Sequence, residues 1–151
     1  LFYMSTPAIV GIVQGNGSFL GAWQWNDGGN ILELLNRKFI DDKSVSDLLS
    51  VGMWSSMWGP RQYKEYLIDT IRNFEGNPDI VNRVKSAQML DNGVYFIKDY
   101  YYEKSPKVYK NVLEALGQDV NYVYVYFPKL HKWKRYTWGD SKEKLRKDNL
   151  I

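Results

Sequence analysis

Cysteine is absent from the 151-residue chain, and histidine occurs once, at position 131. Without cysteine there is no disulfide, no thiolate metal ligand and no cysteine nucleophile, and a reducing cytoplasm is the expected compartment. A single histidine excludes multi-histidine metal sites and restricts any Ser-His-Asp triad to the surroundings of His131. No apolar run approaches the roughly 18 residues that a membrane helix needs. We therefore expect a protein that is neither secreted nor inserted in a membrane, with no metal and no cofactor.

The net charge is modest, +3 from 20 basic and 17 acidic residues. The distribution is uneven. From Lys129 to the end there are eight basic and three acidic residues (+5), against twelve basic and fourteen acidic residues before it (−2). The basic residues gather at the C-terminus, where residues 141–148 are expected to form a short solvated helix or a frayed tail.

Aromatic residues are abundant. Six Trp, twelve Tyr and six Phe make up 16% of a chain that is otherwise globular in composition, with 44% hydrophobic and 25% charged residues. Large rings with polar tips suit either a compact core or an adhesive surface. The length fits one domain over residues 1–151, with residues 1–4 and about 140–151 as candidate flexible ends.

Residues 7–26 predict a β-hairpin. Two extended runs, 7–14 and 19–26, flank a Gly-Asn-Gly-Ser turn whose Asn-Gly pair supplies the positive φ of a tight connection. In the second run Trp23 and Trp25 share one face, opposite Leu20, Ala22 and Gln24, because side chains alternate along a strand. Which of the two faces is buried stays open.

Apolar residues at helical spacing predict a series of helices after the hairpin. The expected helices cover about residues 31–38, the segment from Asp41 or Asp42 to Gly52, residues 63–75 and residues 105–117, with one or two further turns near 80–87. The helix over 105–117 has the strongest signals, a Ser-Pro start and a Gly end. Residues 53–60 are expected to form an aromatic loop folded onto the core, and residues 94–100 a strand.

Alternating residues in 121–127 and 133–138 predict a second hairpin. We prefer a five-residue loop, because a four-residue loop would place valines opposite lysines. The five-residue loop pairs Phe127 with Trp133 and Val125 with Arg135. One face is then apolar and suits the core, whereas the other is aromatic and basic.

The element order predicts an α+β fold. Its antiparallel sheet has about five strands, from two hairpins and one further strand, and its helices pack on one face.

The first hairpin and the two helices after it resemble a family of small phage and prophage proteins. The family has a Gly/Ser hairpin turn, a second strand ending in His-Trp-Asp-Gly, a Leu-Leu helix, and a helix followed by Gly and Ser-Ser. The matching residues, within about 4–58, are Ser5, Thr6, 15–18, Asp27, Gly28, Leu34, Leu35, Val45, Leu48, Leu49, Gly52, Ser55 and Ser56, with a fainter likeness in the C-terminal hairpin.

This chain departs from the family pattern at three places. Trp25 stands where the family has His, residues 29–30 (Gly-Asn) where it has Tyr-Pro, and Met53 where it has Asp. The resemblance implies an origin on a mobile genetic element and a compact α+β fold, with no catalytic residue carried over.

The aromatic and basic face of the second hairpin is the main candidate binding site. Its members are Tyr122, Tyr124, Tyr126, Lys132, Lys134, Tyr136 and Trp138. Rings interleaved with cations hold single-stranded nucleic acid by stacking and phosphate contacts. Tyr, Trp and Arg also dominate protein interfaces. A helix covering this face would instead make the rings part of the core, and all three alternatives stay open.

Two loops give weaker candidates. Trp25 and Asp27 precede a Gly-Gly pair that is able to flex around a ligand, but a plain turn is favoured because no phosphate-binding context surrounds it. The adjacent Asp41 and Asp42 suit helix capping better than metal binding or acid-base chemistry.

The best-supported function class is a non-enzymatic interaction protein of a phage or other mobile element, one that binds and inhibits a host defence or regulatory protein. The alternative is a nucleic-acid-binding module using the second hairpin. A small carboxylate-dependent enzyme using Asp27 or Glu33 is the third hypothesis. The expected partner is a host protein in the host cytoplasm, with no membrane, and the oligomeric state stays open.

Overall fold

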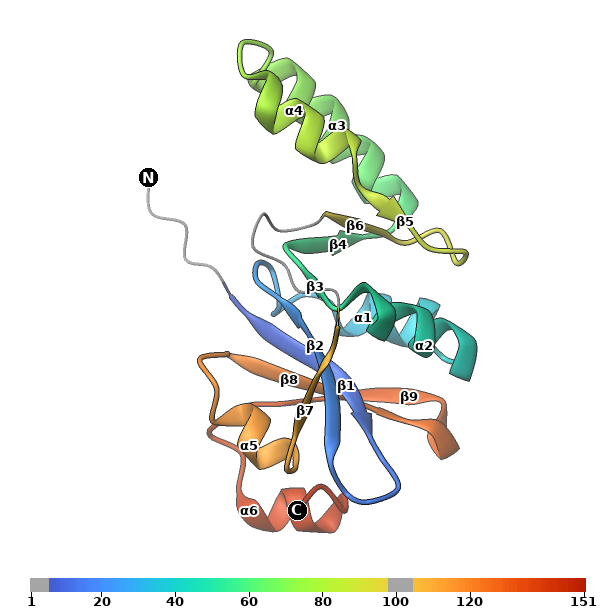
Figure 1. The fold of residues 1–151 in the computed structure, drawn as a ribbon, viewed down its shortest axis with the longest axis vertical. Coiled ribbons are helices and arrows are strands. Elements are labelled where there is room, and N and C mark those ends of the chain that lie inside the picture. The colour runs from blue at the N-terminus through green and yellow to red at the C-terminus, as the bar shows by residue number, and fades with distance from the viewer. Residues whose placement is uncertain (1–5, 98–104) are drawn as a thin grey trace.

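The computed structural model describes residues 6–97 and 105–151, which form a six-stranded sheet, a smaller three-stranded sheet and six helices (Figure 1). The strands are β1 (Ala8–Val13), β2 (Phe19–Gln24), β3 (Met53–Trp54), β4 (Ser56–Trp58), β5 (Gln88–Met89), β6 (Tyr95–Ile97), β7 (Lys107–Tyr109), β8 (Tyr122–Phe127) and β9 (Lys132–Tyr136). The helices are α1 (Leu32–Lys38), α2 (Asp42–Val51), α3 (Pro60–Asn73), α4 (Pro78–Lys85), α5 (Val112–Leu116) and α6 (Lys142–Lys147), with a 3₁₀ turn η1 (Pro128–Leu130).

The large sheet runs in the order β3-β2-β1-β8-β9, and β7 also pairs with β2. The first hairpin is confirmed, since β1 and β2 are antiparallel with Ala8 opposite Gln24 and Val13 opposite Phe19. However, β1 is parallel to β8, and β2 is parallel to β3. The expectation of a purely antiparallel sheet is therefore wrong. The long connection between β1 and β8 leaves room for the helices that a parallel pair needs.

Both faces of the large sheet are buried. Val10 and Tyr124 lie in one core cluster with residues of α1 and α2. Ile9 and Val123, their strand neighbours, lie in a second cluster with residues of α5 and α6. Helices thus cover two faces, not the single face that we predicted, and both faces of β2 are packed. Strands with two buried faces are typical of parallel pairing with helical crossovers.

Helix α2 begins and ends where its capping residues predict. The Asp41 carboxylate accepts the Ser44 backbone N–H at 2.7 Å, which confirms the predicted cap. Gly52 ends the helix with a φ of 82°, a conformation that favours glycine. The chain then forms β3 and β4 rather than the predicted loop, with Trp54 fully buried and its indole N–H bound to the Gln24 side chain at 2.7 Å.

The predicted helix over residues 105–117 is wrong in its first half. Residues 107–109 form β7, which pairs with Phe19, Leu20 and Gly21 of β2. On the side away from β1, strand β3 covers β2 only at Trp23 and Gln24, so β7 satisfies backbone groups that would otherwise stay unpaired. The helix starts at Asn111, whose side chain accepts the Glu114 N–H at 2.9 Å. Of the predicted strand 94–100, residues 95–97 form β6 and residues 98–100 lie outside the described residues.

The predicted register of the second hairpin is wrong by one residue. Phe127 pairs with Lys132 and Val125 with Lys134 across a four-residue connection. Lys134 lies on the same face of the sheet as Val125. Its ammonium is 5.0 Å from the centre of the Phe127 ring and 3.6 Å from the Asp148 carboxylate, so its charge is not left unpaired. The aliphatic stem covers apolar surface while the charge reaches an acid at the periphery.

The C-terminal segment packs on the second core cluster. Leu145 of α6 and Leu150 after it are buried, and the Tyr136 hydroxyl donates to the Asp148 carboxylate at 2.6 Å. The Ser141 side chain accepts the Lys144 N–H at the start of the helix. These contacts attach residues 141–150 to the sheet.

Leu145→Ala is expected to lower the free energy of unfolding by about 2–5 kcal/mol, because it leaves a cavity in the second cluster. Chemical denaturation followed by tryptophan fluorescence measures this change. Leu130→Ala, at a side chain that is 59% exposed, is the matched control and should change stability little. Equal effects of the two substitutions would show that α6 does not contribute to the core.

Candidate protein-binding surface

The seven residues that were predicted to form one binding face differ in burial and lie on both faces of the sheet. Tyr124, Tyr126 and Tyr136 are buried, Tyr122 and Lys134 are half-buried, and Lys132 and Trp138 are exposed. Tyr136 belongs to the opposite face of the sheet from Tyr124 and Tyr126. The residues therefore do not form a continuous exposed platform.

Tyr124 and its strand neighbour Arg135 hold the turn that follows the first hairpin. The Tyr124 hydroxyl donates to the Gly28 carbonyl, and the Arg135 guanidinium donates to the Gly29 carbonyl at 3.2 Å. Arg135 also lies 4.9 Å from the centre of the Tyr122 ring. Burial raises the pKa of Tyr124 to about 12, so this hydroxyl stays a neutral donor at ordinary pH. Two residues on the neighbouring C-terminal strands thus stabilise an N-terminal turn.

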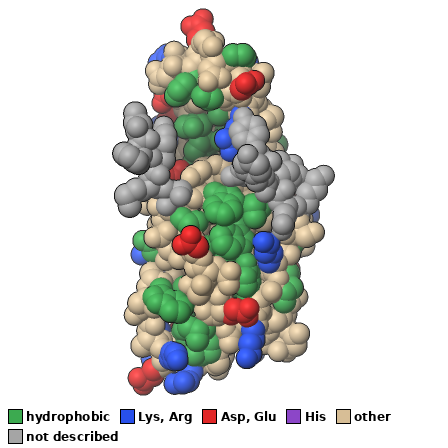
Figure 2. All heavy atoms as spheres, turned by 60° about the vertical axis from the view of Figure 1, so that its left-hand side comes forward, with side chains coloured by type: hydrophobic (Ala, Val, Ile, Leu, Met, Phe, Trp, Pro, Cys, Tyr) green, Lys and Arg blue, Asp and Glu red, His purple; other side chains and the backbone are tan. Residues whose placement is uncertain are grey.

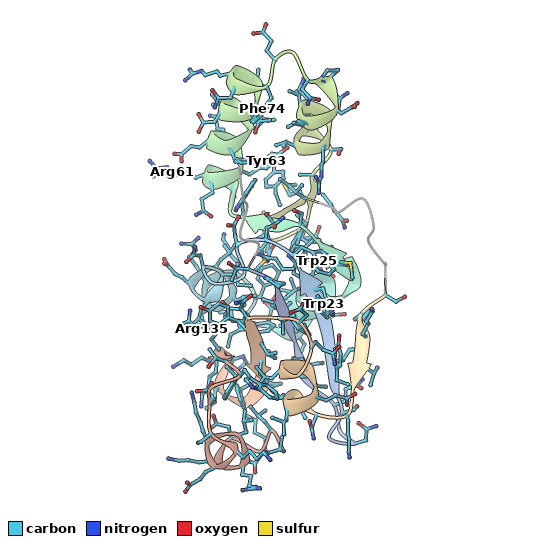
Figure 3. All side chains as sticks on the ribbon, turned by 90° about the vertical axis from the view of Figure 1, so that its left-hand side faces the viewer. Trp23, Trp25, Arg61, Tyr63, Phe74 and Arg135 are labelled. Atoms are coloured by element: carbon cyan, nitrogen blue, oxygen red, sulfur yellow. The ribbon has the colours of Figure 1, made fainter. Side chains whose placement is uncertain are left out.

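The turn itself is the loop that contains the candidates Trp25 and Asp27. Asp27 is exposed at a φ of 58°, and its carbonyl accepts the Asn30 N–H at 3.3 Å, which is the geometry of a plain turn. Trp25 is half-buried, with its ring centre 5.1 Å from that of Trp23. Figure 3 places the two tryptophans one above the other on the same side of the molecule.

Acidic residues are dispersed over the described part of the chain. No three His, Cys, Asp or Glu residues within residues 6–97 and 105–151 lie close enough together to hold a metal ion. Glu33 lies in the first turn of α1, 3.6 Å from Arg37, and is exposed. Asp41 caps α2, and its hydrogen bond from the Ser44 N–H lowers its pKa.

The feature that the sequence did not single out is a projecting helical hairpin, formed by α3 and α4 and here called the arm (residues 60–87). Figure 1 shows these helices extending from the body, with the small sheet β4-β6-β5 at their base. Pro60 occupies the first position of α3 and Pro78 that of α4, where proline favours helix initiation. The Asn77 side chain caps α4.

Within residues 6–97 and 105–151, a small cluster and the contact between the Trp58 and Tyr66 rings hold the arm to its base. The Tyr63 ring stacks on the Tyr95 ring with centres 4.0 Å apart, and the Tyr63 hydroxyl donates to the Val84 carbonyl at 2.7 Å. Tyr63, Val84 and Ile97 are the buried members of this third cluster. The first cluster is several times larger, so the arm has the weaker packing of the two regions.

The arm carries several exposed apolar side chains. Tyr66, Ile68, Ile71 and Phe74 are between 40% and 43% exposed, whereas the other exposed large apolar side chains, among them Leu130 and Trp138, are spread over the rest of the molecule. Ile68 and Ile71 are three positions apart and hence neighbours on one side of α3. Figure 2 shows apolar side chains interspersed with charged ones on the upper part of the molecule, where the arm lies. Tyr66 lies on another side of the helix, with its ring centre 4.0 Å from that of Trp58. Neighbouring exposed apolar side chains such as Ile68 and Ile71 are candidates for an interaction site.

The charge of the arm distinguishes between partner classes. Residues 60–87 contain five basic and four acidic residues, a net charge of +1. Arg61 lies 3.6 Å from Glu65, so part of the basic charge is already paired. Nucleic-acid surfaces depend on an excess of unpaired cations for phosphate contacts. A mixed-charge apolar surface is more typical of protein interfaces.

Comparisons with the models of known protein families, with curated proteins and with solved structures find no match. The resemblance to small phage and prophage proteins therefore stays a prediction from the sequence. In the described part of the chain, no helix combines the length and the hydrophobicity that crossing a membrane requires.

Tyr63→Phe is expected to loosen the arm, because it removes the hydroxyl that binds the Val84 carbonyl while keeping the stacked ring. The loss of one buried hydrogen bond costs about 1 kcal/mol. Limited trypsin digestion, read by mass spectrometry, should therefore cleave basic sites of the arm roughly fivefold faster, since opening precedes cleavage.

Tyr66→Phe is the matched control, because Tyr66 lies on the same helix with its side chain 43% exposed. Its cleavage rates should equal those of the unmodified protein. Unchanged cleavage in Tyr63→Phe would show that this hydrogen bond does not hold α4 in place.

Proposed function

We propose that this protein is a non-enzymatic binding protein that engages a host protein through the arm. In this proposal the chain is encoded by a phage or another mobile genetic element and acts in the host cytoplasm. Its effect is to inhibit the defence or regulatory protein that it binds.

The observation that carries the proposal is the exposed apolar surface of α3. Ile68 and Ile71 lie on α3 and Phe74 directly after it, all three are at least 40% exposed, and the hairpin to which they belong projects from the body (Figure 1). Burying an exposed Ile or Phe side chain contributes about 1.5–3 kcal/mol each, which makes a few such residues sufficient as anchors. The partner that fits is a protein with an apolar groove and a rim of mixed charge, because the arm is nearly neutral.

The mobile-element origin has separate support. The origin is supported by the resemblance over residues 4–58. The location in the host cytoplasm is supported by the absence of cysteine, which favours a reducing compartment. Neither argument involves the arm. The binding proposal and the origin proposal are therefore tested by different experiments.

Ile71→Lys is expected to abolish partner binding without unfolding the protein, because Ile71 is 41% exposed and its replacement places a charge at the apolar surface. The measurement is quantitative affinity capture from a bacterial host lysate, followed by calorimetric titration with the purified captured protein. Capture should fall at least about tenfold, corresponding to the loss of one buried anchor. Binding of the unmodified protein should show a negative heat-capacity change.

Asn73→Lys is the matched control, since it adds the same charge to an exposed polar position of α3. It should bind like the unmodified protein. Equal capture by Ile71→Lys and the unmodified protein would contradict the proposal. Light scattering tests the remaining alternative: if the protein self-associates and Ile71→Lys is monomeric, then the arm contacts a second copy and not a host protein.

A further inference from the structure

The exposed apolar side chains of α3 lie among charged residues. On the surface of a helix, the neighbours of a residue are those three and four positions away. For Ile68 these neighbours are one further apolar residue and three charged ones, and all four are exposed: Lys64, Glu65, Ile71 and Arg72. The apolar pair of Ile68 and Ile71 is therefore bordered by charge.

The three charged neighbours of Ile68 differ in their ion pairs. Glu65 lies 3.6 Å from Arg61, so its negative charge is offset within α3. Lys64 and Arg72 form no ion pair with any residue in the ranges 6–97 and 105–151 that the structure describes. This side of α3 thus presents two uncompensated positive charges, although the arm as a whole is nearly neutral.

The other acidic residues near this part of the arm do not share the side of α3 that carries Ile71. Asp69 is two positions from Ile71, and residues two apart on a helix do not face each other. Glu75 lies beyond the last residue of α3, Asn73. The excess of positive charge beside the apolar pair is therefore local.

The two cations are placed symmetrically about Ile68. Lys64 and Arg72 are eight positions apart, about 12 Å along α3 at 1.5 Å per residue, and Ile68 lies midway between them. A partner that covers Ile68 brings its own surface close to both cations. Acidic groups on that surface attract them and basic groups repel them, so the partner is selected by charge as well as by shape.

We infer that the partner of the arm is a protein whose apolar groove carries Asp or Glu side chains that face Lys64 and Arg72. These acids lie where the groove contacts Ile68, within a rim that is otherwise mixed in charge. The inference rests on the proposed function, because it describes the protein that the arm binds. Phosphate groups would also pair with the two cations, but a nucleic acid offers no apolar groove for Ile68 and Ile71.

The probe for the test is the purified protein that the unmodified chain captures from the host lysate. Lys64→Glu and Arg72→Glu, each at an exposed position, should slow its association at least about fivefold at low salt, because attraction becomes repulsion. High salt should reduce this difference, since it screens exposed charges. Surface plasmon resonance at several salt concentrations measures the association rates.

Lys142→Glu is the matched control. It makes the same change of charge at an exposed residue of α6, which Figure 1 shows at the end of the molecule away from the arm. Its association rate should equal that of the unmodified protein. An equal slowing by Lys142→Glu and Lys64→Glu would show that net charge matters and not the position beside Ile68, which contradicts the inference.

Carbodiimide coupling gives a second readout, because it joins a lysine amine to a carboxylate in direct contact. In the complex, Lys64 should be coupled to an Asp or Glu of the captured protein, and mass spectrometry of the digested complex identifies the pair. Lys142 should not be coupled to the captured protein. Absence of coupling at Lys64 would overturn the acidic rim.

The outcomes separate this inference from the proposed function. Suppose that Ile71→Lys prevents binding while Lys64→Glu and Arg72→Glu associate as fast as the unmodified protein, or faster. The acidic rim is then wrong, and the arm remains the binding site. If Ile71→Lys binds normally, if no protein is captured, or if nuclease treatment of the lysate abolishes capture, both proposals are wrong.

Discussion

The parallel pairing of β1 with β8 is the constraint on which the rest of the fold depends. It joins Ala8 to Tyr122 and Ile12 to Tyr126, segments more than a hundred residues apart. Once these strands are adjacent, β2 and β9 complete the sheet on either side, and both faces need cover. Helices α1 and α2 cover one face, and α5 and α6 the other. The turn after β2 is then within reach of Tyr124 and Arg135, which fix it by hydrogen bonds.

Local signals in the sequence predicted the local structure well. The Asn-Gly turn of the first hairpin, the Asp41 cap and the Gly52 stop lie where the sequence placed them, because each depends on a few adjacent residues. The errors involve partners distant in sequence. Residues 107–109 form a strand that pairs with an edge of β2, and the observed register of the second hairpin places the Lys134 ammonium 3.6 Å from the Asp148 carboxylate. Neither Asp148 nor that edge is visible from local periodicity.

The candidate site shows the same division. The alternation of side chains along residues 121–127 correctly identified β8. Because both faces of the sheet are buried, however, Tyr124 and Tyr126 belong to the core and not to an exposed binding face. The apolar spacing of α3 was also read correctly as a helix. Among the residues that the structure describes, α4 and the small sheet pack against α3, and Ile71 and Phe74 remain exposed. The apolar residues Tyr66 and Ile68, which lie outside the row at helical spacing formed by Tyr63, Leu67, Ile71 and Phe74, were the available signal for a surface.

The body is held by two large core clusters, one on each face of the sheet, whereas the arm is a weakly packed unit that keeps apolar residues accessible. Native-state hydrogen exchange as a function of denaturant tests this most directly. Amides of β1 and β8 should exchange only through global unfolding. Those of α3 and α4 should exchange through a smaller opening, with a lower free energy and a weaker dependence on denaturant. If the amides of the arm were as protected as those of β1 and β8, with the same denaturant dependence, the arm would be part of the main core and the account would be wrong.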